Sequence, residues 1–253
     1  PASTMPLTNQ GKDYVFRVCY TDPFQASIAA KYCYEELNAR KAAVLFDISS
    51  DYGVALGRFF KDSFESLGGS IAAFTPCNAG DQDFSAQLTA IKTANPDVIY
   101  LPAYYEEVSL ILRQARDLGL TQPMLSADGV DVPEIWDLAG PAIDGLMHTA
   151  HWHEKAGMTD IGKKYIAAYK EKYGGKEVNS FGALTADCVL LVLDAIERAG
   201  SAEPKAIRDA LEATENLEVV TGFLSIEEGD AVKAVVIREA RDGKWEFKSI
   251  VNP

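Results

Sequence analysis

The sequence predicts an α/β protein whose parallel β-sheet is covered by helices on both faces. Helical segments and short apolar runs alternate four times before residue 119, and a continuous apolar run is typical of a strand buried on both faces. Polar, aromatic or acidic loops follow three strand segments, at residues 47–53, 103–106 and 127–129. The carboxyl ends of parallel strands share one edge of a sheet, where open α/β sheets bind ligands. We therefore expect the functional site at that edge.

Each element follows from the spacing of apolar residues and from the residues that interrupt it. Apolar side chains recur three or four positions apart in the helices, Gly68-Gly69 ends the second helix, and Asn95-Pro96 ends the third. In order, the expected elements are helix 24–39, strand 42–46, helix 52–67, strand 71–74, helix 84–91, strand 98–101 and helix 108–118.

The pattern changes after Trp136, where helical spacing continues without clear strands and predicts a second, more helical region. Its expected helices are 159–173, 183–199 and 204–213. Short strands are expected at 232–237 and 245–250, separated by Asp242-Gly243, which is typical of a hairpin turn. Near the start of the chain, residues 15–18 also resemble a strand.

Composition limits the classes of partner. The chain has 253 residues, of which 47% are hydrophobic, so it can bury one large core or two modest ones. Its formal net charge of -13 argues against nucleic acid or an anionic membrane, because both select clustered Lys and Arg. No apolar run approaches the roughly 18–20 residues that cross a bilayer, and residues 1–5 lack the pattern of an export signal. We expect any such signal to have been removed.

The sequence predicts no metal, cofactor or catalysis. His148, His151 and His153 resemble metal ligands, but in a strand over 145–153 His148 points to the opposite face, and no fourth ligand is evident. The four cysteines lack CxxC or metal-ligand spacing, which favours unpaired thiols over a disulfide framework. Nucleophile-elbow, Walker, dinucleotide-binding and zincin motifs are absent from the sequence. We therefore expect a protein that is not an enzyme.

Tyr104 and Asp128 each follow a strand and are expected to flank the same crevice. A carboxylate facing an ammonium contributes about 1.5–3 kcal/mol, and a tyrosine face over the same cation adds about 0.5–2 kcal/mol. This pair therefore suits a small zwitterion. The alternative is a solvated loop aspartate beside a tyrosine at the rim.

Two further groups can contact the same ligand. Tyr52 opens a helix whose first amides can receive an anion, with Ser50 or Asp51 as the N-cap; simple capping of those amides is the alternative. Ser3 and Thr4 carry hydroxyls that can serve the ligand, and their alternative is a frayed terminus.

Several short motifs occur in a recognisable order along the chain. They are Phe16 to Gln25, Asp51-Tyr52-Gly53, Gly80 to Phe84, Leu112 to Arg116, Ala127-Asp128-Gly129, and Val220-Thr221-Gly222 followed by Glu228-Gly229-Asp230. Together they resemble the branched-chain amino acid (leucine/isoleucine/valine) ABC transporter substrate-binding proteins. The likeness runs along essentially the whole chain, although each motif alone is weakly specific.

The resemblance implies a type I periplasmic-binding-protein fold, in which two doubly wound parallel-sheet lobes close about a hinge on an amino acid. It also implies roles for single residues. Ser3 and Thr4 would hold the ligand's backbone groups, Tyr52 and Tyr104 would line the pocket, Asp128 would pair with the α-amino group, and Phe181 would lie near the side-chain end. Asp128 stands where the best-known members have Glu, which shortens its reach by one methylene.

Family members begin with several βα units ahead of the turn at residues 1–4, so the resemblance implies that lobe one is incomplete. Residues 23–151 plus 231–253 are expected to form a complete lobe two, and residues 1–22 plus 152–230 the remainder of lobe one. An incomplete lobe exposes apolar helix faces, which favours self-association or pairing with a separate N-terminal chain.

These features together predict an extracytoplasmic solute-binding protein of an ABC importer, either periplasmic or extracellular and membrane-anchored. It would capture a branched-chain or other small apolar amino acid and present it to a membrane permease. The alternative is a sensory or regulatory ligand-binding module of the same fold that recognises amides or aromatic acids, since fold does not fix function.

Overall fold

The computed structural model describes residues 7–8, 11, 13–156 and 159–252. The chain divides into two units. Unit 1 comprises residues 1–21, 151–236 and 249–253, and unit 2 comprises residues 22–150 and 237–248.

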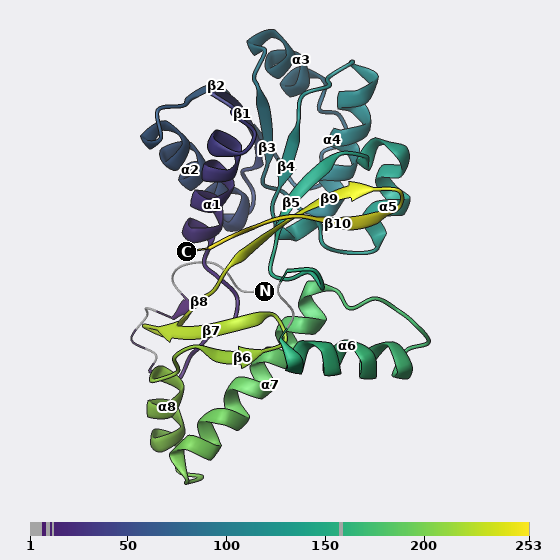
Figure 1. Cartoon of the computed structure of the whole chain (residues 1–253). Coiled ribbons are helices and arrows are strands. Elements are labelled where there is room, and N and C mark those ends of the chain that lie inside the picture. Colours follow the sequence, from purple (N-terminus) through teal and green to yellow (C-terminus); the bar gives the residue numbers. More distant parts are fainter. Residues whose placement is uncertain (1–6, 9–10, 12, 157–158, 253) are drawn as a thin grey trace. The chain divides into compact units, whose positions relative to one another are not determined.

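Unit 2 contains most of a seven-stranded sheet with the order β10-β9-β5-β4-β3-β1-β2 (Figure 1). Its first five strands pair in parallel, for example through Val44 with Tyr100 and Leu125 with Met147. They are β1 Lys41–Asp47, β2 Ser70–Cys77, β3 Val98–Leu101, β4 Met124–Ser126 and β5 Leu146–Ala150. The predicted parallel sheet is therefore confirmed.

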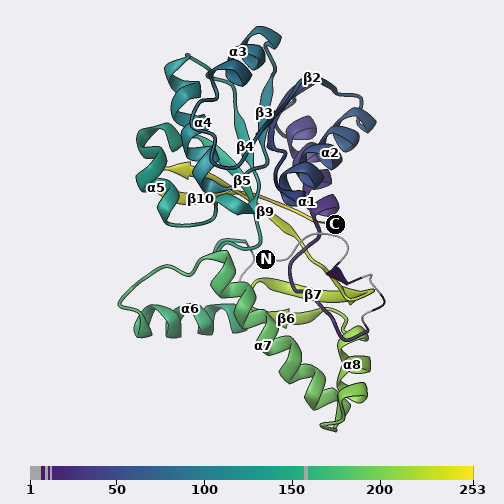
Figure 2. The ribbon, with the colours of Figure 1, turned by 180° about the vertical axis from the view of Figure 1, so that it is seen from behind.

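Helices cover both faces of this sheet. They are α1 Asp22–Glu35, α2 Asp51–Ser66, α3 Ser85–Ala94, α4 Tyr105–Asp117 and α5 Glu134–Ala139, with short 3₁₀ turns η2 Asp128–Val130 and η3 Gly140–Ile143. Figures 1 and 2 show α1 and α2 on one face and α4 and α5 on the other. On the α4 side, buried side chains such as Ile111 and Leu112 pack with Ile99 and Leu101 of the sheet. Burial on both faces explains the continuous apolar strands.

The hairpin predicted near the end of the chain is confirmed. Strands β9 Val235–Arg241 and β10 Lys244–Val251 are neighbours in the sheet and are joined by Asp242 and Gly243, whose φ angles are 50° and 77°. Two consecutive residues with positive φ are what a type I′ turn requires, and Asp-Gly is a preferred pair for it.

Unit 1 contains the predicted helices and a small antiparallel sheet. The helices are α6 Asp160–Lys172, α7 Ser180–Ala199 and α8 Pro204–Glu212, and the strands are β6 Leu217–Val219, β7 Gly222–Glu227 and β8 Asp230–Val232. The core between α7 and this sheet includes Leu184 and Leu191 of α7 and Leu224 and Ile226 of β7. No helix among the described residues is long and apolar enough to cross a membrane.

The structure differs from the sequence prediction at residues 15–18, at the end of the strand expected over 145–153 and at the boundaries of the units. Residues 15–18 are not assigned as a strand, although the N–H of Arg17 donates to the carbonyl of Gly229 at 3.0 Å. Residues 231–236 and 249–253, expected in lobe two, belong to unit 1. Residue 231 belongs to unit 1 because β8 pairs with β7 of that unit, with Ala231 opposite Ile226.

Candidate ligand-binding site

The three loops that follow β1, β3 and β4 meet at the carboxyl edge of the sheet in unit 2. Tyr52 comes from the first turn of α2, Tyr104 is the N-cap of α4, and Asp128 begins η2. The hydroxyl of Tyr52 donates to Asp128 Oδ1 at 2.6 Å and accepts from the N–H of Gly129 at 3.0 Å. The rings of Tyr52 and Tyr104 stack with centroids 5.2 Å apart. The structure therefore brings three of the predicted site residues together.

Tyr52 is positioned by tight packing at the start of α2. The N-cap is Ser50, whose hydroxyl accepts from the N–H of Gly53 at 3.1 Å, so this amide is occupied by capping. A Cβ on Gly53 would lie 2.4 Å from the carbonyl oxygen of Asp47. Only glycine lets the helix start this close to the end of β1. Of the two N-cap residues considered from the sequence, the structure selects Ser50 over Asp51.

Asp128 is 2% exposed. The residues that surround it, Gln25 and Thr149, lie near the two ends of the segment 22–150 of unit 2. Gln25 Nε2 on α1 donates to Asp128 Oδ1 at 2.8 Å and lies 2.7 Å from Thr149 Oγ1 at the end of β5. The sequence analysis assigned no role to Gln25 or Thr149. Gln25 is the last residue of the motif Phe16 to Gln25, which could have drawn attention to it. Thr149 lies near the carboxyl end of a parallel strand, where ligand-binding residues are expected.

The electrostatic environment of the edge is negative. Burial raises the pKa of Tyr52 well above its ordinary value, and the nearby charge of Asp128 and the hydrogen bond to it raise it further. Burial also raises the pKa of Tyr104, with additional contributions from Asp128, Asp22, Asp47 and Glu106. Several carboxylates thus act on one phenol, and a field of this sign favours a cationic ligand group.

This arrangement suits binding of an ammonium group. Asp128 supplies a buried carboxylate acceptor, and Tyr104, which is 44% exposed, supplies an accessible aromatic face beside it. Both phenols are protonated near neutral pH, because burial raises pKa values that ordinarily lie near 10.

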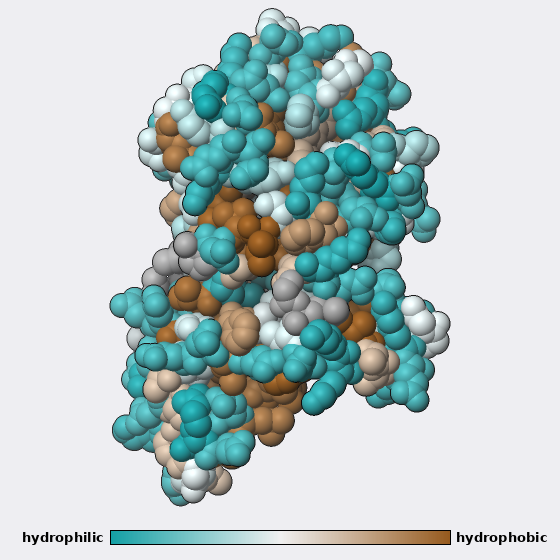
Figure 3. All heavy atoms as spheres, in the orientation of Figure 1, coloured by the Kyte–Doolittle hydropathy of each residue, from teal (hydrophilic) through white to brown (hydrophobic). Residues whose placement is uncertain are grey.

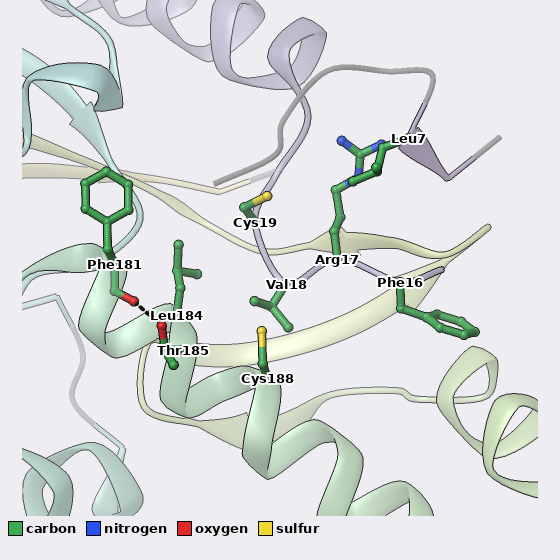
Figure 4. Close-up of a pocket in the computed structure, with 9 residues that line it drawn as sticks. All are labelled: Leu7, Phe16, Arg17, Val18, Cys19, Phe181, Leu184, Thr185 and Cys188. Carbon is green, nitrogen blue, oxygen red and sulfur yellow. Dashed lines mark hydrogen bonds between the residues drawn. The ribbon is translucent and has the colours of Figure 1, made fainter. Parts of the chain in front are cut away.

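Of the other predicted site residues, the structure describes Phe181, which belongs to unit 1. Phe181 lies in the first turn of α7 in unit 1, where it lines a cavity of about 380 Å³. Figure 4 shows side chains of α7, including Leu184 and Cys188, lining this cavity together with those of the segment that contains Val18. Ser3 and Thr4 lie outside the described residues.

The three histidines do not form one cluster within a unit. His148 is buried in β5 of unit 2, whereas His151 and His153 belong to unit 1. The strand expected over 145–153 ends at Ala150. Burial lowers the pKa of His148 to about 4, and its ring centroid lies 4.3 Å from that of Trp245. Among the described residues, no group of three or more His, Cys, Asp or Glu side chains is arranged to hold a metal ion. No disulfide joins the four cysteines, all of which the structure describes.

Comparison with known proteins places this geometry in a family. The sequence profile described as "Periplasmic binding protein" matches residues 2–244. The chain belongs to the periplasmic binding protein family. It is 32% identical over 236 residues to the leucine-, isoleucine-, valine-, threonine- and alanine-binding protein of Pseudomonas aeruginosa, a match that covers 92% of this chain and 61% of that protein.

Two solved structures of family members are similar to this chain along its length. A leucine-binding protein from Thermotoga maritima has 43% identity and a TM-score of 0.93, with 100% of this chain and 72% of the other covered. A branched-chain amino acid transporter substrate-binding protein from Streptococcus pneumoniae, solved with isoleucine, has 32% identity and a TM-score of 0.88, with 99% and 71% covered. The resemblance drawn from the motifs and the type I fold are therefore confirmed.

This member of the periplasmic binding protein family spans less than two thirds of the length of the Pseudomonas relative. The Leu/Ile/Val-binding protein homolog 1 of Brucella abortus, 29% identical, is covered to 67% of its length. The matched part includes all the residues of the candidate site in unit 2.

Proposed function

We propose that this chain is the solute-binding component of an ABC importer and captures a branched-chain or other small apolar amino acid. The observation that supports this most directly is the buried carboxylate of Asp128, hydrogen-bonded to Tyr52, whose ring stacks on the exposed Tyr104. The names of several relatives state that they bind leucine, isoleucine or valine, which supports the same class of ligand here.

In this proposal the α-ammonium of the ligand binds at Asp128 and against the face of Tyr104. The carboxylates that raise the pKa of Tyr104 supply the attraction. Ser3 and Thr4 are proposed to hold the ligand's backbone groups, and Phe181 to contact its side chain. These three roles rest on the family resemblance, and for Phe181 also on its place beside an apolar cavity of unit 1.

The proposed action is capture and delivery without chemistry. The protein is proposed to act outside the cytoplasm, periplasmic or anchored on the outer face of a membrane, and to present its ligand to a membrane permease. Support comes from the family, whose members are solute-binding proteins, and from the candidate site, which combines an acceptor carboxylate with aromatic surface.

We also retain the proposal that the apolar surface of unit 1 favours association. Four apolar side chains on the outer part of α7 are exposed by 40–58%. They are Val189, Val192, Leu193 and Ile196. Figure 3 shows hydrophobic surface gathered where Figure 1 places α7. A contiguous patch of this kind marks an interaction surface, here for a separate N-terminal chain or a second copy.

Light scattering that gives a strictly monomeric mass at all concentrations, with mass spectrometry showing one polypeptide, would contradict association.

Isothermal titration calorimetry with leucine, isoleucine, valine, alanine and phenylalanine tests the binding proposal. The samples are this chain and a fusion that adds the portion of the Thermotoga maritima relative that this chain does not span. In whichever form binds, Asp128→Asn should weaken binding by roughly ten- to a hundredfold, because losing a charged hydrogen bond costs about 1.5–3 kcal/mol.

Asp117→Asn is the matched control, because this exposed carboxylate lies at the far end of α4 from Tyr104. It should leave the affinity unchanged. Absence of binding to all five amino acids in both forms overturns the proposed function. Equal effects of Asp128→Asn and Asp117→Asn on affinity would show that the ligand ammonium does not bind at Asp128.

A further inference from the structure

A buried ion pair lies directly behind the turn that carries Asp128. Arg238 Nη1, on β9, donates to Asp131 Oδ1 at 2.7 Å, and the two side chains are 8% and 4% exposed. Asp131 is the residue immediately after η2, and its N–H donates to the carbonyl of Asp128 at 3.0 Å. Arg238 is therefore connected to the backbone of Asp128 through a single residue.

The turn is three residues long and is held by contacts with other elements. The side chain of Asp128 accepts from Tyr52 and Gln25, and Val130 is buried in the core of unit 2. The N–H of Gly129 donates to Tyr52 Oη, and the N–H of Val132 donates to the carbonyl of Val130 at 2.9 Å. A segment this short has little regular structure of its own, so contacts with neighbouring elements set its conformation.

The ion pair has a different character from a surface salt bridge. Burying two charges costs several kcal/mol per ion, roughly what their attraction returns, so such a pair is a weak source of stability. Its geometry is more restrictive than apolar packing, because a guanidinium donates along fixed directions. The neighbouring ring of His148 stays neutral near pH 7, because burial holds its pKa near 4.

We propose that Arg238 is a positioning residue for ligand binding: acting through Asp131, it fixes the turn Asp128–Val130 so that Asp128 meets Tyr52 and the ligand ammonium. This rests on the proposed function of Asp128. Arg238 does not itself contact the ligand in this proposal. Its effect on affinity therefore passes through Asp128.

A double-mutant cycle on affinity tests that route. Arg238→Met should weaken amino acid binding on the order of tenfold in the otherwise unchanged protein, and have little further effect once Asp128→Asn is present. Arg238→Lys keeps the charge and should restore part of the affinity. Arg241→Met is the control, because this arginine lies on the same strand, has a side chain 59% exposed and pairs with Glu239. A merely structural role of Arg238 predicts the same loss in both backgrounds, which would overturn the proposal.

A second measurement does not depend on ligand. If the turn moves in Arg238→Met, Asp128 separates from Tyr52, and the raised pKa of the Tyr52 phenol should fall. Alkaline titration of tyrosinate absorbance, with the Tyr52 contribution identified by Tyr52→Phe, reports this shift. If Arg238→Met is unstable, Asp131→Asn takes its place and should also lower the pKa of the Tyr52 phenol. An unchanged Tyr52 titration in every folded variant overturns the proposal, whereas a shift without any amino acid binding leaves positioning intact and refutes only the proposed function.

Discussion

The buried ion pair of unit 1, between Asp187 on α7 and Lys233 after β8, predicts a stability loss that depends on which charges are removed. Lys233 Nζ lies 3.7 Å from Asp187 Oδ2, and the side chains are 2% and 0% exposed. Thr221 bridges the pair, donating to Asp187 Oδ2 and accepting from Lys233. Burial raises the pKa of Asp187 and lowers that of Lys233, in each case outweighing the opposite effect of the partner. The attraction within the pair therefore does not fully offset its burial.

The size of the stability loss follows from the balance between the burial of the two charges and their attraction. Lys233→Met leaves Asp187 as a buried carboxylate without its cation, and we expect a loss of about 3–5 kcal/mol in the free energy of unfolding of unit 1. Asp187→Leu should cost a similar amount. The double variant removes both charges and should lie within ~1 kcal/mol of the unchanged protein, because apolar residues often replace buried ion pairs without loss.

Urea unfolding followed by tryptophan fluorescence measures these losses. Trp152 is buried in unit 1, and the other two tryptophans, Trp136 and Trp245, are in unit 2, so replacing both with Phe leaves a reporter for unit 1 alone. Lys163→Met is the control, since its ion pair with Asp160 has side chains 56% and 81% exposed. It should change the free energy of unfolding by less than about 0.5 kcal/mol.

The pH dependence gives a further check. A carboxyl whose pKa is raised in the folded state contributes stability at low pH and loses it as the pH rises through that pKa. The deficit of Lys233→Met should therefore shrink as the pH falls and Asp187 takes up a proton. Losses that simply add in the double variant, or single losses below about 1 kcal/mol, would refute the reasoning.

Three further outcomes are expected in unit 2. Gly53→Ala should destabilise by about 1–3 kcal/mol in thermal or urea unfolding, because its Cβ would meet the carbonyl of Asp47 at 2.4 Å. Gly57→Ala in the same helix, where the nearest atom is 3.3 Å away on a side chain, should cost markedly less; equal losses would contradict the clash. The pKa of His148 is lowered to about 4, so its contribution to stability is complete above its unfolded value of about 6.5 and is lost as the pH falls toward 4. Its ring protons, assigned with His148→Gln, should show no NMR titration near pH 6, and a midpoint there would refute the burial argument. The phenol of Tyr52 should remain protonated where ordinary tyrosines ionise, and Asp128→Asn should lower its pKa; an unchanged titration in that variant would contradict the contact.

Much of unit 2 was predictable because its determinants are local. Helical spacing, apolar runs and the Gly and Pro residues that interrupt them act within a few positions, so the alternation of helices and strands follows from neighbouring residues. The hairpin at Asp242-Gly243 is predictable for the same reason, since its two positive φ values are set by the turn itself. Tyr52, Tyr104 and Asp128 could be chosen together because parallel strands place their carboxyl ends on one edge. Their role in binding remains a prediction.

Buried polar partners could not be predicted in this way. Gln25 and Asp128 are 103 positions apart, and Asp131 and Arg238 are 107 apart, yet each pair is in hydrogen-bonding contact. Nothing near any of these residues in the sequence specifies its partner. Residues 15–18 show the converse error: their composition suits a strand, but a strand forms only where another chain segment offers a ladder.

The sequence by itself determined the fold class, the order of most elements, the family and the edge of the sheet where function should be sought. These depend on periodicity, turn chemistry and motif order, all of which are properties of neighbouring residues. Only the tertiary structure decided which polar groups are buried against one another, that Ser50 rather than Asp51 caps α2, and where the chain passes between its units. Those outcomes depend on segments far apart in sequence, because a buried polar group is stable only beside the partner that packing brings to it.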